Sequence, residues 1–330
     1  MKILLIAKPW KGGLGRYFFL ALQDMFPGQV EWMSTRPQGL IERLIFRRDP
    51  EGWWRGFLKK IETTPCDAAF FVGYRKEFQA LKPQKHYTLY IVDDVRMAAG
   101  DAAAFGRVFL SDPGYENELR AAISPQQYGG VLPFAYYPPL HKPAAARVPW
   151  GDVCFIGNRD AKRDPYLEQL FTDGLNPLIV DNYFMNSPLF WQHPLSFRPT
   201  VSNDAMGDIY AGHKVSLNVH ARVVRQGTNM RTFECAGYGI PQVVEYREGI
   251  ENYFEPEREI LACRDPHEMA AQIRALLNDP ARAQNMAAAA MRRARAEHTY
   301  HHRIAAALGH LLPEQALRET LQKTLTRKAA

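Results

Sequence analysis

The sequence has 330 residues, 46% of them hydrophobic and 23% charged, and 41 Lys and Arg against 35 Asp and Glu give a net charge of +6. This ordinary globular composition excludes disorder, collagen-like repeats and low-complexity sequence as the main state of the chain. The length predicts two domains rather than one, with enough residues to bury a core without disulfides or metals.

The N-terminal segment predicts the start of a nucleotide-binding type of α/β domain. A short apolar strand, Lys2–Ala7, runs into a glycine loop at residues 11–15, and a helical pattern begins at Arg16. Strand, glycine loop and helix open many folds of this class. Further strands are expected at residues 68–72, 87–92 and 108–110. We therefore expect a Rossmann-like domain over residues 1–135.

Residues 40–61 interleave cations with large apolar side chains. The cations are Arg43, Arg47, Arg48, Arg55, Lys59 and Lys60, and the apolar residues include two tryptophans. This pattern is typical of an interfacial helix on anionic lipid, of a surface for a polyanionic glycan or nucleic acid, or of a domain helix that packs its aromatic residues inward. Pro50 and Gly52 argue against one continuous helix.

Five prolines between Val131 and Pro149 predict a linker, which we take as a hinge over residues 136–150. The α/β pattern then resumes and predicts a second Rossmann-like domain over residues 151–295, followed by a helical segment over 296–330. The expected strands are 152–156, 177–180, 215–219 and 242–244, and the expected helices start near 165, 232 and 266, with an Ala- and Arg-rich helical stretch over 281–312.

The predicted fold is therefore an α/β protein with two Rossmann-like domains facing across a cleft and a C-terminal helix that packs back. Ligands of open α/β sheets bind at the carboxyl ends of the strands, so such a cleft is the expected site.

Four cysteines stand far apart, without the spacing of a zinc site or a disulfide framework: Cys66, Cys154, Cys235 and Cys263. We expect reduced, buried thiols in a cytoplasmic protein. The first ten residues lack the long apolar core of a signal peptide, and no segment approaches 18 consecutive apolar residues, so no membrane span is expected.

The most informative segment is residues 227–241, GTNMRTFECAGYGIP. A helix starting near Asn229 would direct its N-terminal N–H groups and dipole at an anion, with Arg231 adding charge. Glu234, one turn further, would accept hydrogen bonds from two ribose hydroxyls. An ordinary solvated helix with Arg231 and Glu234 as surface charges is the alternative.

The run NMRTFECAGYGIPQVV resembles the N-x-R-x-F-E-x-x-A-x-G-x-P signature of GT-B glycosyltransferases of the bacterial spore-maturation-protein CgeB-like group. Three further segments are similar to that group in order and spacing: VLPFA through HKP (131–143), DVCFIGN (152–158) and IYA through LNVH (209–220). The resemblance covers about residues 130–305. Over the first 130 residues it depends on the glycine loop and the alternation of strands.

The resemblance implies transfer of a sugar from a nucleotide-diphosphate sugar to an acceptor hydroxyl, with no cofactor and no essential metal. It implies a nucleotide-sugar site that includes Gly13, Asn158, Arg159, Arg163, His220, Gln226, Thr228, Asn229, Arg231 and Glu234. The arginines would stabilise the diphosphate. Related retaining enzymes have a Glu-x7-Glu element; Gln226 stands at its first position and Glu234 at its second, so the stereochemical outcome stays open.

Asp93 and Asp94 follow the expected strand 87–92, and either would take the proton of the acceptor hydroxyl as it attacks. A turn or helix-cap role is the alternative, and His220 and His141 are rival bases. The cluster of His298, His301 and His302 has no fourth ligand at zinc spacing, so we expect it to solvate or pack a helix face.

The family suggests bacterial surface polysaccharide, lipid-linked glycan or flagellar protein as acceptor, in the cytoplasm or at an anionic membrane surface on its inner face. Three alternatives remain. One is a glycosyltransferase acting on DNA bases, and the second is a non-catalytic protein that binds a nucleotide or sugar. The third, an NAD-dependent dehydrogenase, is disfavoured because the full GxGxxG fingerprint and its acidic residue are missing.

Overall fold

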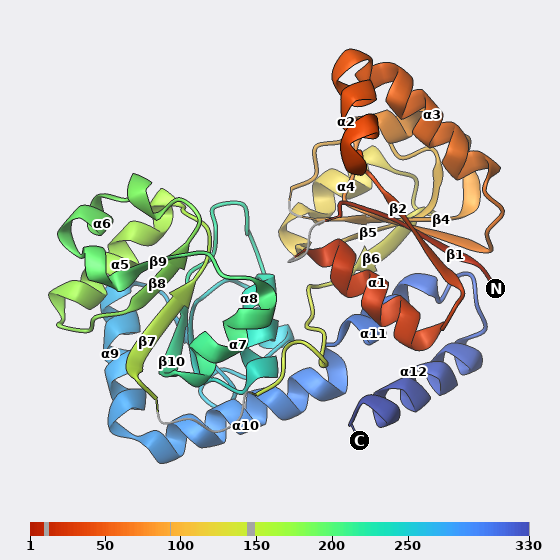
Figure 1. The fold of residues 1–330 in the computed structure, drawn as a ribbon. Helices are drawn as coiled ribbons and strands as arrows, with labels where there is room; N and C mark the ends of the chain where they lie inside the picture. Colours follow the sequence, from red (N-terminus) through yellow and green to blue (C-terminus); the bar gives the residue numbers. More distant parts are fainter. Residues whose placement is uncertain (10–12, 93, 144–148, 330) are drawn as a thin grey trace. The chain divides into compact units, whose positions relative to one another are not determined.

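The computed structural model describes residues 1–9, 13–92, 94–143 and 149–329, which form two compact units (Figure 1). Unit 1 comprises Met1–Pro133 and Tyr300–Ala330, and unit 2 comprises Phe134–Thr299. The chain thus leaves unit 1 after Pro133 and returns to it at Tyr300. All described residues of the expected hinge, 136–143 and 149–150, belong to unit 2.

Unit 1 contains a six-stranded sheet in which every neighbouring pair of strands is parallel, in the order β2-β1-β3-β4-β5-β6. The sheet is apolar at its centre, and all five residues of β1 are buried, as expected of a strand covered on both faces. The strands are β1 (Ile3–Ala7), β2 (Val30–Ser34), β3 (Ala68–Val72), β4 (Gln84–Ile91), β5 (Phe105–Leu110) and β6 (Tyr128–Val131).

Aromatic side chains hold the helices of unit 1 on both faces of this sheet. Phe18 of α1 contacts the rings of Phe70, Tyr90 and Tyr300 at centroid distances of 4.9, 5.5 and 5.0 Å, so α1 and α11 cover one face together. Trp54 of α3 packs toward the other face. The helices are α1 (Leu14–Met25), α2 (Gly39–Arg48), α3 (Pro50–Thr63), α4 (Glu116–Ala122), α11 (Tyr300–Leu308) and α12 (Glu314–Ala329).

Unit 2 contains a second parallel six-stranded sheet, in the order β12-β11-β10-β7-β8-β9. The strand order reverses between β7 and β10, because β7 pairs with β8 on one side and with β10 on the other. The strands are β7 (Gly151–Ile156), β8 (Leu178–Asp181), β9 (Phe197–Pro199), β10 (His213–Asn218), β11 (Gln242–Glu245) and β12 (Leu261–Cys263).

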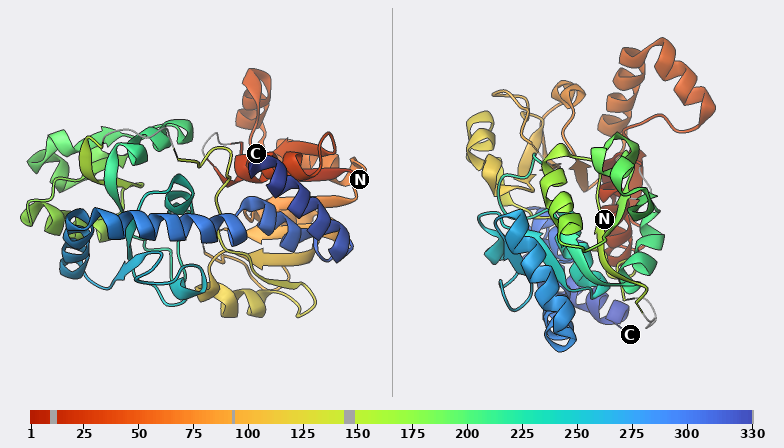
Figure 2. Two further views of the ribbon diagram at one scale, coloured as in Figure 1. Left: turned by 90° about the horizontal axis from the view of Figure 1, so that it is seen from below. Right: turned by 90° about the vertical axis from the view of Figure 1, so that its left-hand side faces the viewer.

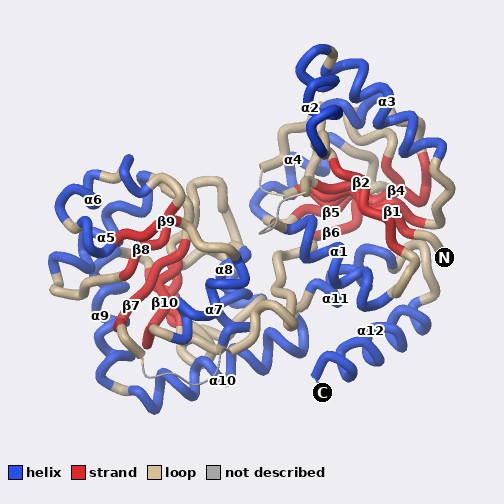
Figure 3. Tube along the Cα trace, in the orientation of Figure 1, coloured by secondary structure: helices blue, strands red, loops and turns tan. Residues whose placement is uncertain are grey.

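The period-2 alternation of β7 divides the core of unit 2 into two layers. Val153 and Phe155 point to the layer covered by α5, α9 and α10, whereas Cys154 and Ile156 point to the layer covered by α7 and α8. Figure 3 shows the helices around this sheet. They are α5 (Asp164–Thr172), α6 (Pro188–Gln192), α7 (Asn203–Ala211), α8 (Met230–Tyr238), α9 (Pro266–Asn278) and α10 (Pro280–Glu297).

The structure confirms one helical prediction, the break near Pro50, and corrects another. The segment 40–61 forms two helices, α2 and α3; Asp49 ends the first, and its side chain caps the second by accepting from the Gly52 N–H at 2.8 Å, with Pro50 at the first position. The stretch 281–312 is divided as well, because α10 ends at Glu297. None of the helices in the described part of the chain has the length and apolarity needed to cross a bilayer.

Candidate functional site

Polar side chains gather at the carboxyl edge of the unit 2 sheet, where β7 ends at Ile156, β10 at Asn218 and β11 at Glu245. The loops after β7 and β10 diverge because the strand order reverses between these two strands. Ligands of open α/β sheets bind at such a reversal. This edge is therefore the candidate site, and it contains most of the residues expected from the sequence.

Arg163 links the loops that follow β7 and β10. Its guanidinium is buried, donates from Nε to the Val219 carbonyl at 2.9 Å, and also donates from Nη1 to the Asn158 carbonyl. Burial lowers the pKa of Arg163, and although Asp160 and other carboxylates oppose this, the charge of Arg231 adds to it. Arg163 and Arg231 are thus close enough for their charges to interact beneath this edge.

Lys162 and Glu245 form a second link across the edge, which the sequence analysis did not identify. Lys162 Nζ lies 2.7 Å from Glu245 Oε1, and the other oxygen of Glu245 accepts from the backbone N–H of His220 at 3.0 Å. Arg247 lies 2.8 Å from the same carboxylate. Two sequence features could have pointed to this pair: Lys162 lies between the expected phosphate-binding residues Arg159 and Arg163, and Glu245 directly follows the strand expected at 242–244.

His220 is fully buried at the end of β10. Neither ring nitrogen makes a well-formed hydrogen bond within the described residues, although the Gly227 backbone slightly favours the protonated ring. Burial, followed by the charges of Arg247, Lys162 and Arg163, lowers the pKa of His220 to about 3. The ring is therefore neutral near pH 7. It is also a weak base there, which does not suit it to proton abstraction.

The helix α8 begins where the sequence predicted it. Asn229 is its N-cap, and Oδ1 accepts from the Arg231 N–H at 3.0 Å. The amides of Asn229 and Asn218 also exchange two hydrogen bonds of 3.0 Å each, which fixes the helix start against the end of β10. Thr228 hydrogen-bonds the hydroxyl of Thr232 at 2.5 Å. The positive end of the α8 dipole therefore lies at the edge of the sheet.

Glu234 lies inside unit 2 between two partners. One carboxylate oxygen pairs with Arg231 Nη1, and the other lies 3.4 Å from Nε2 of His141, with both Glu234 and His141 side chains fully buried. His141 Nδ1 accepts from the Tyr137 N–H at 2.9 Å, so a neutral ring has its proton on Nε2, facing the carboxylate. Glu234 therefore fixes Arg231, whose side chain is partly exposed. The ribose contact expected of Glu234 stays a prediction.

Three other residues that were expected to bind the nucleotide-sugar lie near the same edge, each with a different partner. Arg159 pairs with Asp164 at 2.6 Å, and its Nε and Nη1 are buried without a hydrogen-bond partner among the described residues. The Asn158 side chain accepts from Asn182 at 3.0 Å. The amide of Gln226 donates to a carboxylate oxygen of Glu248 at 3.4 Å, within unit 2.

The remaining expected site residues belong to unit 1. Asp94 follows β4 and accepts from Arg96 Nε; Asp93 lies outside the described residues. Gly13 is the N-cap of α1. Next to it, Gly15 has a structural reason to be glycine, because a Cβ there would lie 2.8 Å from the Lys8 carbonyl. The glycine loop thus allows α1 to pack closely on β1, and the proton-accepting role of Asp93 or Asp94 stays a prediction.

The C-terminal histidines have structural partners, as expected. His298 Nε2 contacts the Tyr253 carbonyl at 2.9 Å, and His301 Nε2 lies 3.0 Å from a carboxylate oxygen of Asp24. Within the ranges that the structure describes, no three His, Cys, Asp or Glu side chains come together as metal ligands.

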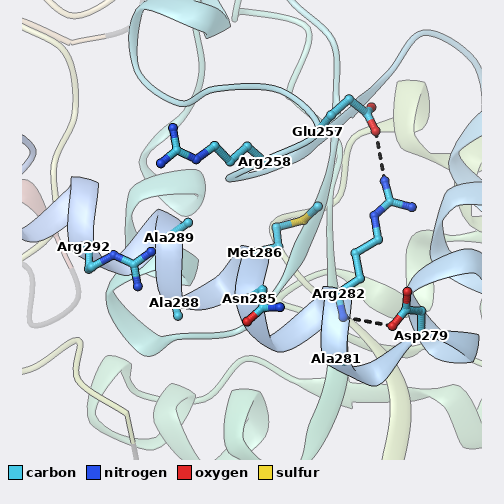
Figure 4. Close-up of a pocket in the computed structure, with 10 residues that line it drawn as sticks. All are labelled: Glu257, Arg258, Asp279, Ala281, Arg282, Asn285, Met286, Ala288, Ala289 and Arg292. Atoms are coloured by element: carbon cyan, nitrogen blue, oxygen red, sulfur yellow. Dashed lines mark hydrogen bonds and ion pairs between the residues drawn. The ribbon is translucent and has the colours of Figure 1, made fainter.

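Unit 2 also has a pocket beside α10, away from the β7–β10 edge (Figure 4). Glu257 and Arg258 on one side of it precede β12, so they lie at the amino edge of the sheet rather than at its carboxyl edge. Arg282 pairs with Glu257 at 3.0 Å within this pocket, and its backbone N–H donates to Asp279 at 3.0 Å. The internal pairing and the position both favour the β7–β10 edge as the functional site.

Comparison with known sequences finds a similarity in the C-terminal part of the chain. Residues 161–309, a little under half of the sequence, match a family model described as glycosyl transferase-like. The matched region contains Arg163, His220, Arg231 and Glu234, and it begins just after Arg159. No curated protein sequence matches the chain.

Solved structures are similar over nearly the whole chain. Sucrose-phosphate synthase from Thermosynechococcus elongatus has a TM-score of 0.66 at 12% identity, covering 98% of this chain and 100% of that one. HepE from Anabaena, solved with UDP, has a TM-score of 0.66 at 10% identity and the same coverage. The DNA-modifying β-glucosyltransferase has a TM-score of 0.58 at 10% identity, again covering 98% and 100%. The chain therefore has the two-domain α/β fold of GT-B glycosyltransferase structures, and its residues 161–309 match a glycosyl transferase-like family model.

Proposed function

We propose that this protein transfers a sugar from a nucleotide-diphosphate sugar to an acceptor hydroxyl, and that the donor binds at the β7–β10 edge of unit 2. The observation that carries the proposal is the position of Arg163 and Arg231 at this edge, beside the N-terminus of α8. A diphosphate is the ligand that a helix N-terminus and paired arginines favour.

Each residue of the edge has a proposed task. Arg231, held by Glu234, contacts the diphosphate, and Arg163 holds the two loops at the spacing that the ligand needs. The unpartnered N–H groups of Arg159 supply further donors. We include His220 in the proposed site as a neutral, buried ring beneath these groups. Gln226, Thr228, Asn229 and Asn158 complete the pocket, and Glu234 or Gln226 reaches the sugar–ribose part.

In the reaction, the acceptor oxygen attacks the anomeric carbon as the bond from that carbon to the diphosphate oxygen breaks. The nucleoside diphosphate leaves with the bonding electrons, and the arginines stabilise its added charge. We propose Asp94 or Asp93 of unit 1 as the group that takes the acceptor proton. We further propose that these cations replace a metal ion, so that the enzyme needs no metal.

The donor is proposed to be a uridine nucleotide, on the analogy of relatives that were solved with UDP and UDP-glucose. As acceptor we propose a bacterial surface glycan, a lipid-linked glycan or a protein, used in the cytoplasm, and we propose membership of the CgeB-like group on the four matching segments. The similarity to a DNA-modifying glucosyltransferase keeps DNA as the second candidate acceptor.

Calorimetric titration with UDP, other nucleoside diphosphates and their sugars tests the donor site. Arg231→Ala should weaken binding of the correct nucleotide by roughly 10- to 100-fold, the value of one charge-assisted hydrogen bond, whereas Arg231→Lys should retain part of the affinity. Arg274→Ala, at a half-exposed arginine of α9 that pairs with Asp173, is the control. Wild-type affinity in Arg231→Ala would show that the site is elsewhere.

Sugar release from the donor separates the proposed enzyme from a protein that only binds. The purified protein should release nucleoside diphosphate from its donor, and addition of acceptor should accelerate the release. Binding without any release would favour a non-catalytic protein. Tight DNA binding that weakens steeply with salt, together with transfer to DNA, would favour the second candidate acceptor.

A further inference from the structure

Helix α2 of unit 1 exposes an aliphatic face. None of its residues is buried, and the exposed fractions of Leu40, Ile41, Leu44 and Ile45 are 74%, 75%, 50% and 49%. At positions i, i+1, i+4 and i+5 these side chains share one face of the helix. Single exposed apolar residues are common on proteins, but four on one helical face indicate an interaction surface.

The opposite side of α2 attaches the helix to unit 1. Phe46 is half-buried and meets the ring of Trp53 on α3 at 5.4 Å, and Trp53 stacks on Phe57 at 5.2 Å. Figure 2 shows α2 and α3, in red-orange, standing out from the rest of unit 1. The aliphatic face is thus free to meet a partner without any change in the core.

A cationic cleft lies beside this face. It is lined by Arg36, Arg43, Arg47 and Arg75, with Leu40 and Leu44 of α2, and no Asp or Glu lines it in the described part of the chain. The only acidic residue of α2, Glu42, accepts from the Gln38 N–H at its own helix start.

The charge of this region also acts on its neighbours. Burial lowers the pKa of Lys8, and the charges of Arg36 and Arg75 lower it further. Arg75 lies over the ring of Trp54 at 4.6 Å, which holds its guanidinium in position at the cleft.

We propose that α2 docks on an anionic lipid surface, with its four aliphatic side chains in the headgroup–acyl boundary and a lipid phosphate in the arginine-lined cleft. An interfacial helix combines such an apolar face with flanking cations. The inference concerns unit 1 alone, so it goes beyond the proposed function and does not depend on it.

Other occupants fit these features less well. A nucleic acid would be held by cations and by exposed aromatic rings, and it would leave four aliphatic side chains in water. A second copy of the chain on a twofold axis would bring Arg43, Arg47 and Arg48 of both chains into one interface, where like charges repel. Both are outcomes that the experiment distinguishes.

Flotation of the full chain with vesicles tests the proposal. One set contains phosphatidylcholine alone and the other contains phosphatidylcholine with phosphatidylglycerol, each at low and high salt. We expect binding to the anionic vesicles only, decreasing with salt. Arg43→Gln with Arg47→Gln should weaken it roughly 25-fold, at about 5-fold for each cation near the surface. Leu40→Ser with Ile41→Ser should weaken binding at both salt concentrations.

Matched variants control for charge and for surface apolarity. Lys323→Gln with Arg327→Gln removes the same charge from exposed positions of α12, and Leu195→Ser removes an aliphatic side chain of unit 2 that is 86% exposed. Both should bind vesicles like the wild type. All variants should keep the melting temperature and the UDP affinity, because the substituted side chains are exposed.

Three results would overturn the proposal: equal binding to both kinds of vesicle, α2 variants that bind like the controls, or a dimer in gel filtration that the α2 variants dissociate. If the wild type bound none of the nucleoside diphosphates or their sugars, the proposed function would be refuted and the vesicle result would stand unchanged. The two failures are thereby distinguishable.

Discussion

Replacing His220 with glutamine should reduce the loss of folding stability that this protein undergoes as the pH falls below about 6.5. In the folded chain the buried ring has a pKa of about 3, whereas an exposed histidine has a pKa near 6.5. Between these values the unfolded chain takes up a proton that the folded chain does not. Stability is therefore complete above about pH 6.5 and decreases as the pH falls toward 3.

The size of the effect follows from that difference in proton uptake. One pKa unit corresponds to about 1.4 kcal/mol, so His220 should cost the wild type about 1.4 kcal/mol at pH 5.5 and about 2.7 kcal/mol at pH 4.5, relative to pH 7.5. Other buried histidines, such as His213, contribute in both proteins, because burial lowers the pKa of His213 as well. The difference between wild type and variant isolates His220.

Urea unfolding followed by tryptophan fluorescence at pH 7.5, 5.5 and 4.5 measures this difference. The His220→Gln variant should lose less stability than the wild type on acidification, whatever its stability at pH 7.5. His213→Gln should reduce the dependence of stability on pH by a smaller amount. The hydrogen bond from that ring to the Ile209 carbonyl, at 2.7 Å, opposes the lowering of its pKa by burial. Parallel profiles for wild type and His220→Gln would refute the assignment of a neutral, buried ring to this position.

Three further outcomes are expected. Gly237→Ala should lower the melting temperature by several degrees, because the added Cβ would lie 2.3 Å from Cδ2 of Tyr136. The control Gly56→Ala adds a Cβ that meets open space on helix α3, so it should leave the melting temperature unchanged or raise it. Equal effects of the two substitutions would contradict the packing argument. Asp94→Asn or Asp93→Asn should reduce turnover at least 100-fold with donor affinity retained, and undiminished turnover in both would exclude them as the base. Sugar transfer should continue in excess EDTA, and a loss that magnesium restores would show that the arginines do not replace a metal.

Local sequence signals predicted the elements that build the edge of unit 2. The apolar run before Gly157 gave β7, and Asn229 marked the start of α8 because its side chain caps the helix. Pro50 indicated the break between α2 and α3. These features depend on neighbouring residues, so a single sequence contains them.

Contacts between distant residues were beyond such reasoning. Lys162 meets Glu245 across 83 positions, and no local pattern marks either residue as the partner of the other. The enclosure of Glu234 by His141 likewise depends on the tertiary fold, and for this reason a residue expected to contact a ribose is fully buried. The short strands β9 and β12 have three residues each, too few to show a period.

The return of the chain to unit 1 at Tyr300 determines the order in which the protein can fold during its synthesis. Unit 2 is continuous, so all of its residues are synthesised before α11 and α12. Until then α1 lacks the helix that covers Phe18 and Tyr17, both of which contact the ring of Tyr300. Unit 1 therefore begins first and finishes last, and a nascent chain arrested before Tyr300 should expose an apolar surface that chaperones recognise.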